Sequence, residues 1–312
     1  MRVVFMGSPP FAGPVFDALL ARPRHDVVAL VTRPDKPRGR GMKVEESDLV
    51  RAARSRDIEV LQPDRARGPE FIERLRSFAP DVALVASFGE ILRQDVLDVP
   101  RLGCLNVHAS LLPRHRGASP IQAALLAGDL ETGVSIQRMV LALDEGDIVV
   151  EARTPIEAHE NSGELLARLS LIGGDAAVNA LDQLESGQAH FTPQDPSRAT
   201  FATKIKKEHG LVDWSKSAVE IDRLVRAFTP WPGARTKFAG VDIGVLDVRV
   251  RADVTASGHP GTIMSIKPTL LVACAVGVLE IRALKPAGKG RMDAHAWSNG
   301  ARPELGARFG DA

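Results

Sequence analysis

Short apolar runs alternate with amphipathic segments through the first half of the chain. Helix-like apolar periodicity occupies residues 15–21, 48–55 and 69–78, and the apolar runs lie at residues 3–6, 27–32, 82–86 and 105–108. Parallel strands that helices cover on both faces have this nearly continuous apolar character, because neither face meets water. The alternation therefore predicts an α/β domain built on a mostly parallel sheet.

A long helix is predicted from about residue 161 to residue 184. Asn161 and Glu164 have the spacing of a capping box, in which each side chain accepts a hydrogen bond from the backbone N–H of the other residue. An amphipathic run follows this pair. We therefore expect the helix to begin at the pair.

The chain changes character after this helix. Residues 187–196 contain Gly, two Pro, Gln and Asp without periodicity, which is typical of a linker. After one helical candidate at residues 218–228, short β-like runs separated by Gly and Pro predict a small β-barrel or sandwich. We therefore expect a first domain at residues 1–188, a linker at 189–206 and a second domain at 207–312.

Composition places the chain among soluble globular proteins. Its 312 residues are 44% hydrophobic and 25% charged, which suffices for two folded units. No apolar run approaches the roughly 18 residues that span a bilayer, and we expect a cytoplasmic protein without a signal segment. Cys104 and Cys274 each lie in an apolar stretch, which indicates buried thiols rather than a disulfide or a zinc site.

The net charge of +1 conceals an asymmetry between the two parts of the chain. Residues 1–200 hold 23 Lys and Arg against 28 Asp and Glu, whereas residues 201–312 hold 17 against 11. A basic second domain favours a polyanionic partner. A merely solubilising surface explains the same charges, so composition alone leaves both interpretations open.

Three polar side chains form a candidate site for acyl transfer to an amine. Asn106 and His108 stand at the end of the fourth apolar run, and ligands of parallel sheets bind beyond the carboxyl ends of strands. Asp144 lies in a turn further along the chain. The amide donates without titrating, the imidazole exchanges a proton near neutrality, and the carboxylate accepts one. Asp147, in the same turn, is the alternative carboxylate, unless it only caps the turn.

Residues 106–122 read NVHASLLPRHRGASPIQ, and this long motif resembles the methionyl-tRNA formyltransferases. Further similar segments of the first part are VFMGSPPFA at 4–12, TGVSI at 132–136 and LDEGDI at 143–148. The second part is similar at ATKIKKE (202–208), VDW (212–214) and RAFTPWPGA (226–234). The resemblance covers essentially the whole chain. One departure is His115, where the family usually has Trp.

The resemblance implies a Rossmann-like formyltransferase domain followed by a small OB-like β-barrel that binds tRNA. It also implies transfer of the formyl group of 10-formyltetrahydrofolate to the amino group of initiator methionyl-tRNA, for translation initiation. By motif position, the catalytic roles fall on Asn106, His108 and Asp144, and the motif favours Asp144 over Asp147. The stretch expected to contact folate consists of Ser110, Leu111, Leu112 and Pro113. We expect no metal and a monomer.

Residues 33–43 carry five cationic side chains and one acid between Pro and Gly residues. A charge run of this kind usually forms a solvated surface loop. In the methionyl-tRNA formyltransferases, which this chain resembles, the corresponding loop enters the acceptor end of tRNA. We therefore expect residues 33–43 to contact RNA phosphates. The residues expected to bind RNA are Arg38, Arg40 and Lys43 in this loop and Lys204, Lys206 and Lys207 in the second part.

Two other functions remain open on the sequence. A formyltransferase that acts on a small amine, such as a sugar nucleotide or glycinamide ribonucleotide, would use the same three polar groups. The basic loop and the basic second domain argue against it, because a small substrate needs neither. A noncatalytic RNA-binding protein with an old enzyme fold is the other alternative, but binding alone would not require Asn106, His108 and Asp144 together.

Overall fold

The computed structural model describes residues 1–35, 37–38 and 43–310. Backbone contacts divide it into two compact units. The first unit comprises residues 1–120, 131–156 and 166–203, and the second comprises residues 121–130, 157–165 and 204–312. The segment expected to be a linker therefore divides between the two, with residues 189–203 in the first unit.

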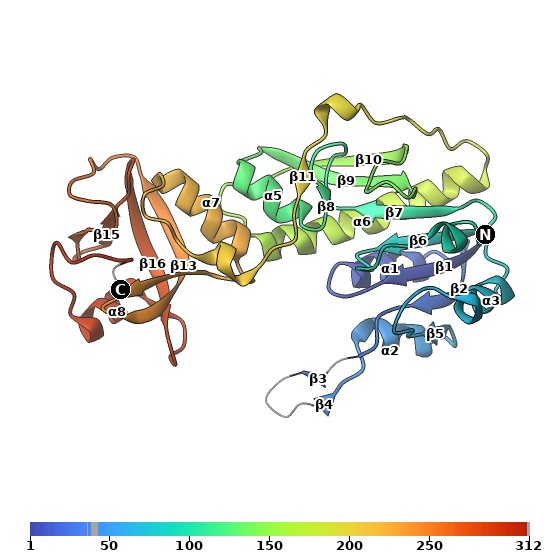
Figure 1. The fold of residues 1–312 in the computed structure, drawn as a ribbon, viewed down its shortest axis with the longest axis horizontal. Helices are drawn as coiled ribbons and strands as arrows, with labels where there is room; N and C mark the ends of the chain where they lie inside the picture. Colours follow the sequence, from blue (N-terminus) through green and yellow to red (C-terminus); the bar gives the residue numbers. More distant parts are fainter. Residues whose placement is uncertain (36, 39–42, 311–312) are drawn as a thin grey trace. The chain divides into compact units, whose positions relative to one another are not determined.

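The first unit contains a seven-stranded sheet (Figure 1). In spatial order its strands are β10 (Ile148–Pro155), β9 (Glu131–Arg138), β7 (Cys104–His108), β6 (Val82–Ala86), β1 (Arg2–Gly7), β2 (Asp26–Val31) and β5 (Glu59–Leu61). The five strands from β7 to β5 are parallel, whereas β9 and β10 are antiparallel to their neighbours. The prediction of a mostly parallel sheet is confirmed, and the two antiparallel strands were not anticipated.

Helices cover both faces of this sheet, because its strands present apolar side chains alternately to each side. Phe5 of β1 packs on Phe16, with 5.0 Å between ring centroids, and Phe16 belongs to α1 (Ala12–Leu20). Val4 and Met6 point the other way and join the core that includes Leu75. That core packs on α3 (Pro69–Ser77) and α4 (Gln94–Leu97). The short α2 (Asp48–Arg54) follows residues 43–47.

The long helix α6 (Ser162–Glu185) begins at the predicted capping box. The side chain of Asn161 accepts the N–H of Glu164 at 3.1 Å, and the Glu164 carboxylate accepts the N–H of Asn161 at 3.0 Å. Further along, Gly174 lets α6 approach α1 closely. A Cβ atom at Gly174 would lie 2.7 Å from the Cβ of Ala18.

The second unit is built on an antiparallel sheet. Its strands follow the order β12 (Ala234–Phe238), β13 (Val241–Arg251), β16 (Val278–Pro286), β15 (Leu270–Ala273) and β14 (Ile263–Ser265), with β17 (Met292–Asp293) paired to β16. Register shifts in β13 near Asp247 interrupt the ladder, and such bulges bend a strand. The prediction of a small β-domain in the second part is confirmed at this level.

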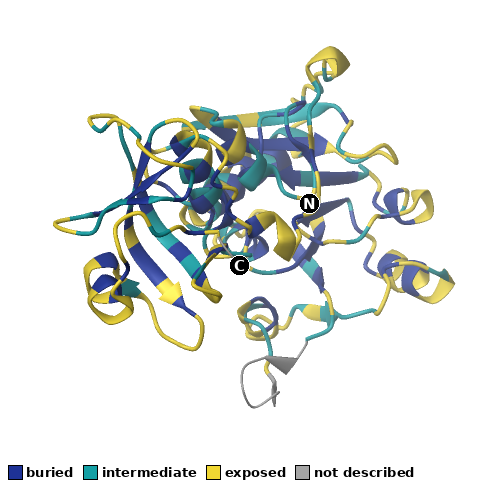
Figure 2. Ribbon diagram, turned by 60° about the vertical axis from the view of Figure 1, so that its left-hand side comes forward, coloured by how far each residue is buried: buried dark blue, intermediate teal, exposed yellow. Residues whose placement is uncertain are grey.

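The helices α7 (Ala218–Phe228) and α8 (Ala294–Ala301) pack on this sheet. Between them and the strands lies an aromatic core in which Trp214 and Trp297 both stack on Phe309, at centroid distances of 5.7 and 5.5 Å. Figure 2 shows buried residues along strands of both sheets, although β10 contains only half-buried and exposed residues. Each unit therefore has a hydrophobic core of its own.

The described thiols match the sequence prediction. Cys104 and Cys274 are free and buried, and burial raises the pKa of each to about 12. A thiol with such a pKa stays protonated at neutral pH and is a poor nucleophile. Among the described residues, no helix combines the length and the apolar character that a bilayer span requires.

Candidate active site

Asn106 and His108 lie near the carboxyl end of β7, at the border between the parallel strands and the antiparallel β9. Because side chains alternate along a strand, residues two apart share a face. The His108 side chain is nearly buried, with 6% of its surface exposed, and Asp144 is 14% exposed. The turn that carries Asp144 follows β9, the antiparallel neighbour of β7.

The carboxylate of Asp144 is the meeting point of the three groups. Its Oδ1 accepts Nδ2 of Asn106 at 3.4 Å and Nε2 of Gln137 at 2.9 Å. Its Oδ2 accepts the backbone N–H of Gly117 at 2.8 Å and lies 3.7 Å from Nδ1 of His108. The structure therefore brings all three predicted catalytic side chains together at one carboxylate.

Both ring nitrogens of His108 face acceptors. Nε2 lies 3.0 Å from the carbonyl oxygen of His115, and Nδ1 faces Oδ2 of Asp144. A neutral imidazole has one N–H and an imidazolium has two. Only the protonated ring serves both acceptors, so this surrounding suits an imidazole that gains a proton during the reaction.

The turn around Asp144 has an unusual backbone. Asp144 itself adopts a left-handed conformation with φ of 52°, which is uncommon for residues other than Gly. Two residues on, a Cβ atom at Gly146 would lie 1.6 Å from the carbonyl oxygen of Arg138. Gly is therefore required at position 146 for this turn to lie against β9.

The competing carboxylate, Asp147, is not part of the cluster. Its backbone carbonyl accepts the N–H of Arg138 at 2.9 Å, which continues the pairing of the turn with β9. The carboxylate that contacts Asn106 and His108 is that of Asp144. Geometry thus favours Asp144, as the motif does.

Comparison with known proteins assigns the family. The sequence model of the formyl transferase family matches residues 1–181, and that of the formyl transferase C-terminal domain family matches residues 204–302. A methionyl-tRNA formyltransferase of Roseiflexus sp. (strain RS-1) is 40% identical over 312 residues, which cover 100% of this chain and 96% of the relative. That of Pseudomonas entomophila (strain L48) is 44% identical over 93% of each chain. The chain belongs to the methionyl-tRNA formyltransferase family.

A solved structure with a similar fold is HypX from Aquifex aeolicus in complex with tetrahydrofolic acid. The match covers 98% of this chain and 48% of that chain, with a TM-score of 0.66 and 16% sequence identity. At this identity the likeness concerns the fold alone. It places this methionyl-tRNA formyltransferase family member on the same architecture as a protein that binds a folate.

The stretch expected to contact folate forms a loop against β9. The hydroxyl of Ser135 donates to the carbonyl of Ser110 at 2.8 Å and accepts the N–H of Leu112 at 3.1 Å. The side chain of Ser110 is buried and donates to the carbonyl of Arg114 at 2.6 Å. Leu112 and Pro113 are buried, and Leu111 is half-buried. The hydroxyl of Ser110 therefore holds the loop, and contact of this stretch with folate stays a prediction.

Four side chains for which the sequence predicted no role surround the Asp144 turn. They are Arg116, Gln137, Glu145 and Gln194. Arg116 is 4% exposed and pairs with Glu145 at 2.9 Å. Gln194 comes from the segment interpreted as a linker, and it contacts both Arg116 and the Asp144 turn. No local sequence pattern indicates the two glutamines, because their partners are distant along the chain. Gln137 contacts Asp144, 7 positions away, and Gln194 contacts Arg116, 78 positions away.

The residues expected to bind RNA are placed only in part. Arg38 and Lys43 lie on the two-stranded hairpin of β3 (Pro37–Arg38) and β4 (Lys43–Val44). Their side chains, and the whole of Arg40, lie outside the described part of the structure. In the second unit, Lys204, Lys206 and Lys207 are exposed on either side of the buried Ile205. Their role in RNA binding stays a prediction.

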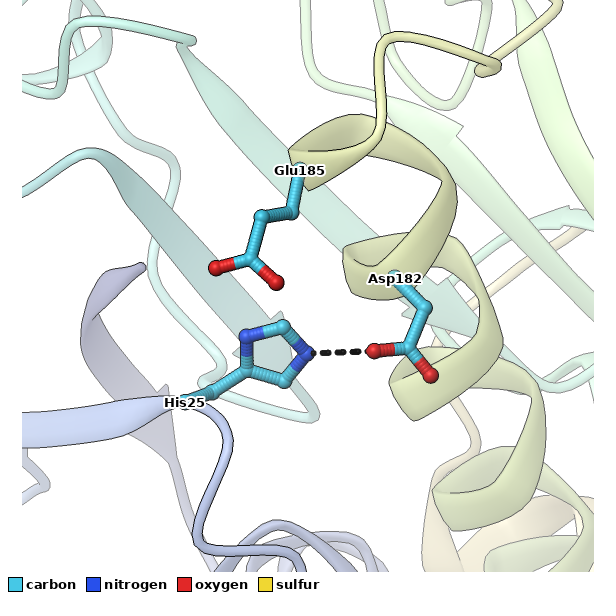
Figure 3. Close-up of side chains that lie close together, drawn as sticks. All are labelled: His25, Asp182 and Glu185. Carbon is cyan, nitrogen blue, oxygen red and sulfur yellow. Dashed lines mark hydrogen bonds and ion pairs between the residues drawn. The ribbon is translucent and has the colours of Figure 1, made fainter.

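One group of side chains among the described residues has the composition of a metal site (Figure 3). His25 is buried and lies 3.1 Å from Asp182 through Nε2, and Glu185 lies beside them on α6. The Glu185 carboxylate already accepts the amino-terminal ammonium at 2.9 Å and Arg24 at 2.7 Å, and these hydrogen bonds lower its pKa. Two cations thus balance the two carboxylates. We interpret the group as an ion-pair cluster that fixes the end of α6.

Proposed function

We propose that the protein transfers a formyl group from 10-formyltetrahydrofolate to the α-amino group of methionine carried on initiator tRNA, for translation initiation. The observation that carries the proposal is the convergence of Asn106 and His108 on Asp144, in a chain that is related over its whole length to enzymes named for this reaction. The tetrahydrofolate complex of a protein with the same fold supports a folate as the formyl carrier.

The arrangement suits attack of an amine on a formyl carbon. Negative charge develops on the formyl oxygen, and fixed donors aimed at that oxygen lower the barrier. Asn106 has two amide hydrogens, of which one faces Asp144 and the other remains for the oxygen. His108 can also donate, provided that its Nε2 exchanges the carbonyl of His115 for the substrate. Catalytic hydrogen bonds commonly tighten in this way only when substrate is bound.

Proton transfer completes the reaction. A free α-amino group has a pKa of about 7.7–8.0, so a large part of it is protonated at neutral pH and must first lose a proton. The Asp144 carboxylate accepts that proton, directly or through His108. A bond forms between the amine nitrogen and the formyl carbon, and the bond from that carbon to the folate nitrogen breaks. The second amine proton ends on the folate nitrogen, so the products are the formylated methionyl-tRNA and tetrahydrofolate.

The remaining parts of the proposal concern the rest of the chain. We infer that the second domain, at residues 207–312, is an OB-like barrel that contacts the tRNA, supported by its antiparallel sheet and its excess of six positive charges over residues 201–312. Arg38, Arg40 and Lys43, with Lys204, Lys206 and Lys207, are the proposed phosphate contacts. The enzyme is proposed to act as a monomer in the cytoplasm and without a metal, because the chemistry above requires only side chains.

The direct test compares acceptors. The purified protein is incubated with 10-formyltetrahydrofolate and, in parallel, methionyl-tRNA, free methionine and an amino sugar nucleotide. We expect efficient formylation of the charged tRNA alone. Turnover of the sugar nucleotide would indicate a small-amine formyltransferase, and binding of tRNA without any formyl transfer would indicate a noncatalytic RNA-binding protein.

A further inference from the structure

Gln194 connects the segment after α6 to the turn that carries Asp144. Its Nε2 donates to the backbone carbonyls of Asp144 at 2.9 Å and Gly146 at 2.7 Å, and it lies 3.2 Å from Oε1 of Gln137. Its Oε1 accepts Nε and a terminal nitrogen of Arg116, at 3.1 and 2.8 Å. One side chain therefore spans the two loops that meet at the Asp144 carboxylate.

The partners fix which way the Gln194 amide faces. Arg116 can only donate, so the amide oxygen must face it, and the two backbone carbonyls can only accept, so the amide nitrogen must face them. Gln137 is oriented by the same logic. The Asp144 carboxylate accepts from Nε2 of Gln137, which leaves Oε1 of Gln137 to face Gln194. Turning either amide around would bring donor against donor and acceptor against acceptor.

Arg116 anchors the outer end of the chain of contacts. Its guanidinium is nearly buried between the Glu145 carboxylate and Gln194. Arg116 and Gly117 form β8, which pairs in parallel with β11 (Phe201–Ala202), a few residues after Gln194. The N–H of Gly117 in turn donates to Oδ2 of Asp144. The segment after α6 therefore reaches both oxygens of the carboxylate, through Gln137 on one side and Gly117 on the other.

We propose that Gln194 is a positioning residue, which holds the Asp144 carboxylate in place against Asn106 and His108. Gln194 does not touch these two side chains, so it acts through the backbone of the Asp144 turn and through Gln137. Asp144 has a left-handed backbone, which is uncommon for residues other than Gly, and the two hydrogen bonds from Gln194 hold the turn in this conformation. The segment after α6, which the sequence indicated as a linker, is thus part of the proposed catalytic site. This inference rests on the proposed role of Asp144.

The variant that tests it is Gln194→Glu. Glutamate has nearly the shape of glutamine and can still accept from Arg116, but it presents an oxygen to the carbonyls of Asp144 and Gly146. We expect kcat for formylation to fall on the order of 10²-fold, the typical effect of displacing a catalytic group by about 1 Å. The KM for methionyl-tRNA should stay within about threefold, because Gln194 makes no proposed RNA contact.

Gln188→Glu is the matched control, because Gln188 is exposed and lies six positions earlier in the same segment. It makes the same change of charge and should leave kcat unchanged. Gln194→Met removes the hydrogen bonds of Gln194 without adding charge. It replaces Gln194→Glu as the test if the glutamate variant does not fold, as judged by urea unfolding. For either folded Gln194 variant, a kcat within threefold of the parent, or a loss confined to KM, would overturn the proposal.

Failure of the proposed function would look different. If the parent protein formylates no methionyl-tRNA, or if Asp144→Asn retains full activity, the catalytic assignment itself is wrong. If the parent is active and Asp144→Asn is not, but Gln194→Glu keeps the parental kcat, only the positioning role is wrong.

Discussion

At the scale of single residues, the Asp144 carboxylate is the centre of the candidate site, because four donors from three parts of the chain are arranged around its two oxygens. A carboxylate surrounded in this way is fixed in position. The turn behind it is equally constrained, since Gly146 has no room for a side chain. The geometry of the candidate site therefore depends on residues other than Asn106, His108 and Asp144 themselves.

Gly146→Ala tests the constraint on the turn. The added Cβ would meet the Arg138 carbonyl at 1.6 Å, so the turn must move away from β9 and take Asp144 with it. We expect kcat for formylation to fall at least on the order of 10²-fold. Gly13→Ala is the control, because a Cβ at Gly13 meets no other atom within 4 Å, and it should keep parental activity. An active Gly146→Ala enzyme would show that the turn tolerates displacement.

Asp253 supplies a pH-dependent contact in the second unit. Hydrogen bonds from Arg251 lower the pKa of its carboxyl from 3.8 to about 2. A carboxyl whose pKa is depressed by folding stabilises the folded state above its unfolded pKa and loses that effect as the pH falls through the folded pKa. We expect Asp253→Asn to be less stable than the parent at pH 5, with a difference that disappears between about pH 4 and pH 2. Thermal unfolding across this range measures it, and a pH-independent difference would contradict the assignment.

The sequence indicated the three side chains of the candidate site but not the residues that surround them. Asn106 and His108 are two apart in one apolar run, so the period of a strand already places them on one face. Asp144 is 38 positions from Asn106, and the resemblance to a family favoured it over Asp147. Gln194 is 50 positions from Asp144 in a segment with no periodicity, and no rule for reading a sequence predicts such a contact.

At the scale of elements, helix ends were well predicted because their signals are local. The pair of Asn161 and Glu164 forms the expected capping box, and α6 begins directly after Asn161. The strands β9 and β10 were not predicted as elements. β9 is a buried run like its parallel neighbours, and β10 has half-buried and exposed residues that alternate only from Val150 onward.

Asn161→Ala tests the start of α6. The variant loses the acceptor for the N–H groups of Gly163 and Glu164, and such caps contribute typically about 1 kcal/mol to stability. We expect the free energy of unfolding in urea to fall by about that amount. Asn179→Ala, on an exposed face within the same helix, is the control and should not destabilise, since Ala favours helix interiors. Equal losses in both variants would argue against a specific cap.

At the scale of the whole molecule, the chain forms two units of different character, and the segment after α6 that contacts the Asp144 turn lies in the first unit. The first 200 residues carry a net charge of −5 and the remainder +6, and the basic segment at 33–43 is the exception within the acidic part. Charge of this distribution suits a substrate whose reactive amine is attached to a polyanion. The sequence alone revealed this asymmetry of charge, whereas the path of the segment after α6 could be seen only in the folded structure.

Neutralising the basic segment tests the RNA contact. Arg38→Gln together with Arg40→Gln should raise the KM for methionyl-tRNA and leave kcat largely unchanged, because the arginines are proposed to contact phosphates only. Each lost phosphate contact should reduce the slope of log affinity against log salt by about 0.7–0.9. Arg74→Gln with Arg76→Gln, on the exposed face of α3, is the matched control. An unchanged salt slope in the first pair would rule out the contact.

The measurement that bears most directly on the central claim is the behaviour of Asp144→Asn, with kcat for formylation and the Kd for methionyl-tRNA measured on the same preparation. Asn has the same shape but cannot accept the amine proton, and the loss of such a proton acceptor typically costs about 10²–10⁴-fold in rate. We predict a loss of kcat in that range, with a Kd within about threefold of the parent. An unchanged kcat, or a Kd that weakens in proportion to kcat, would contradict the account.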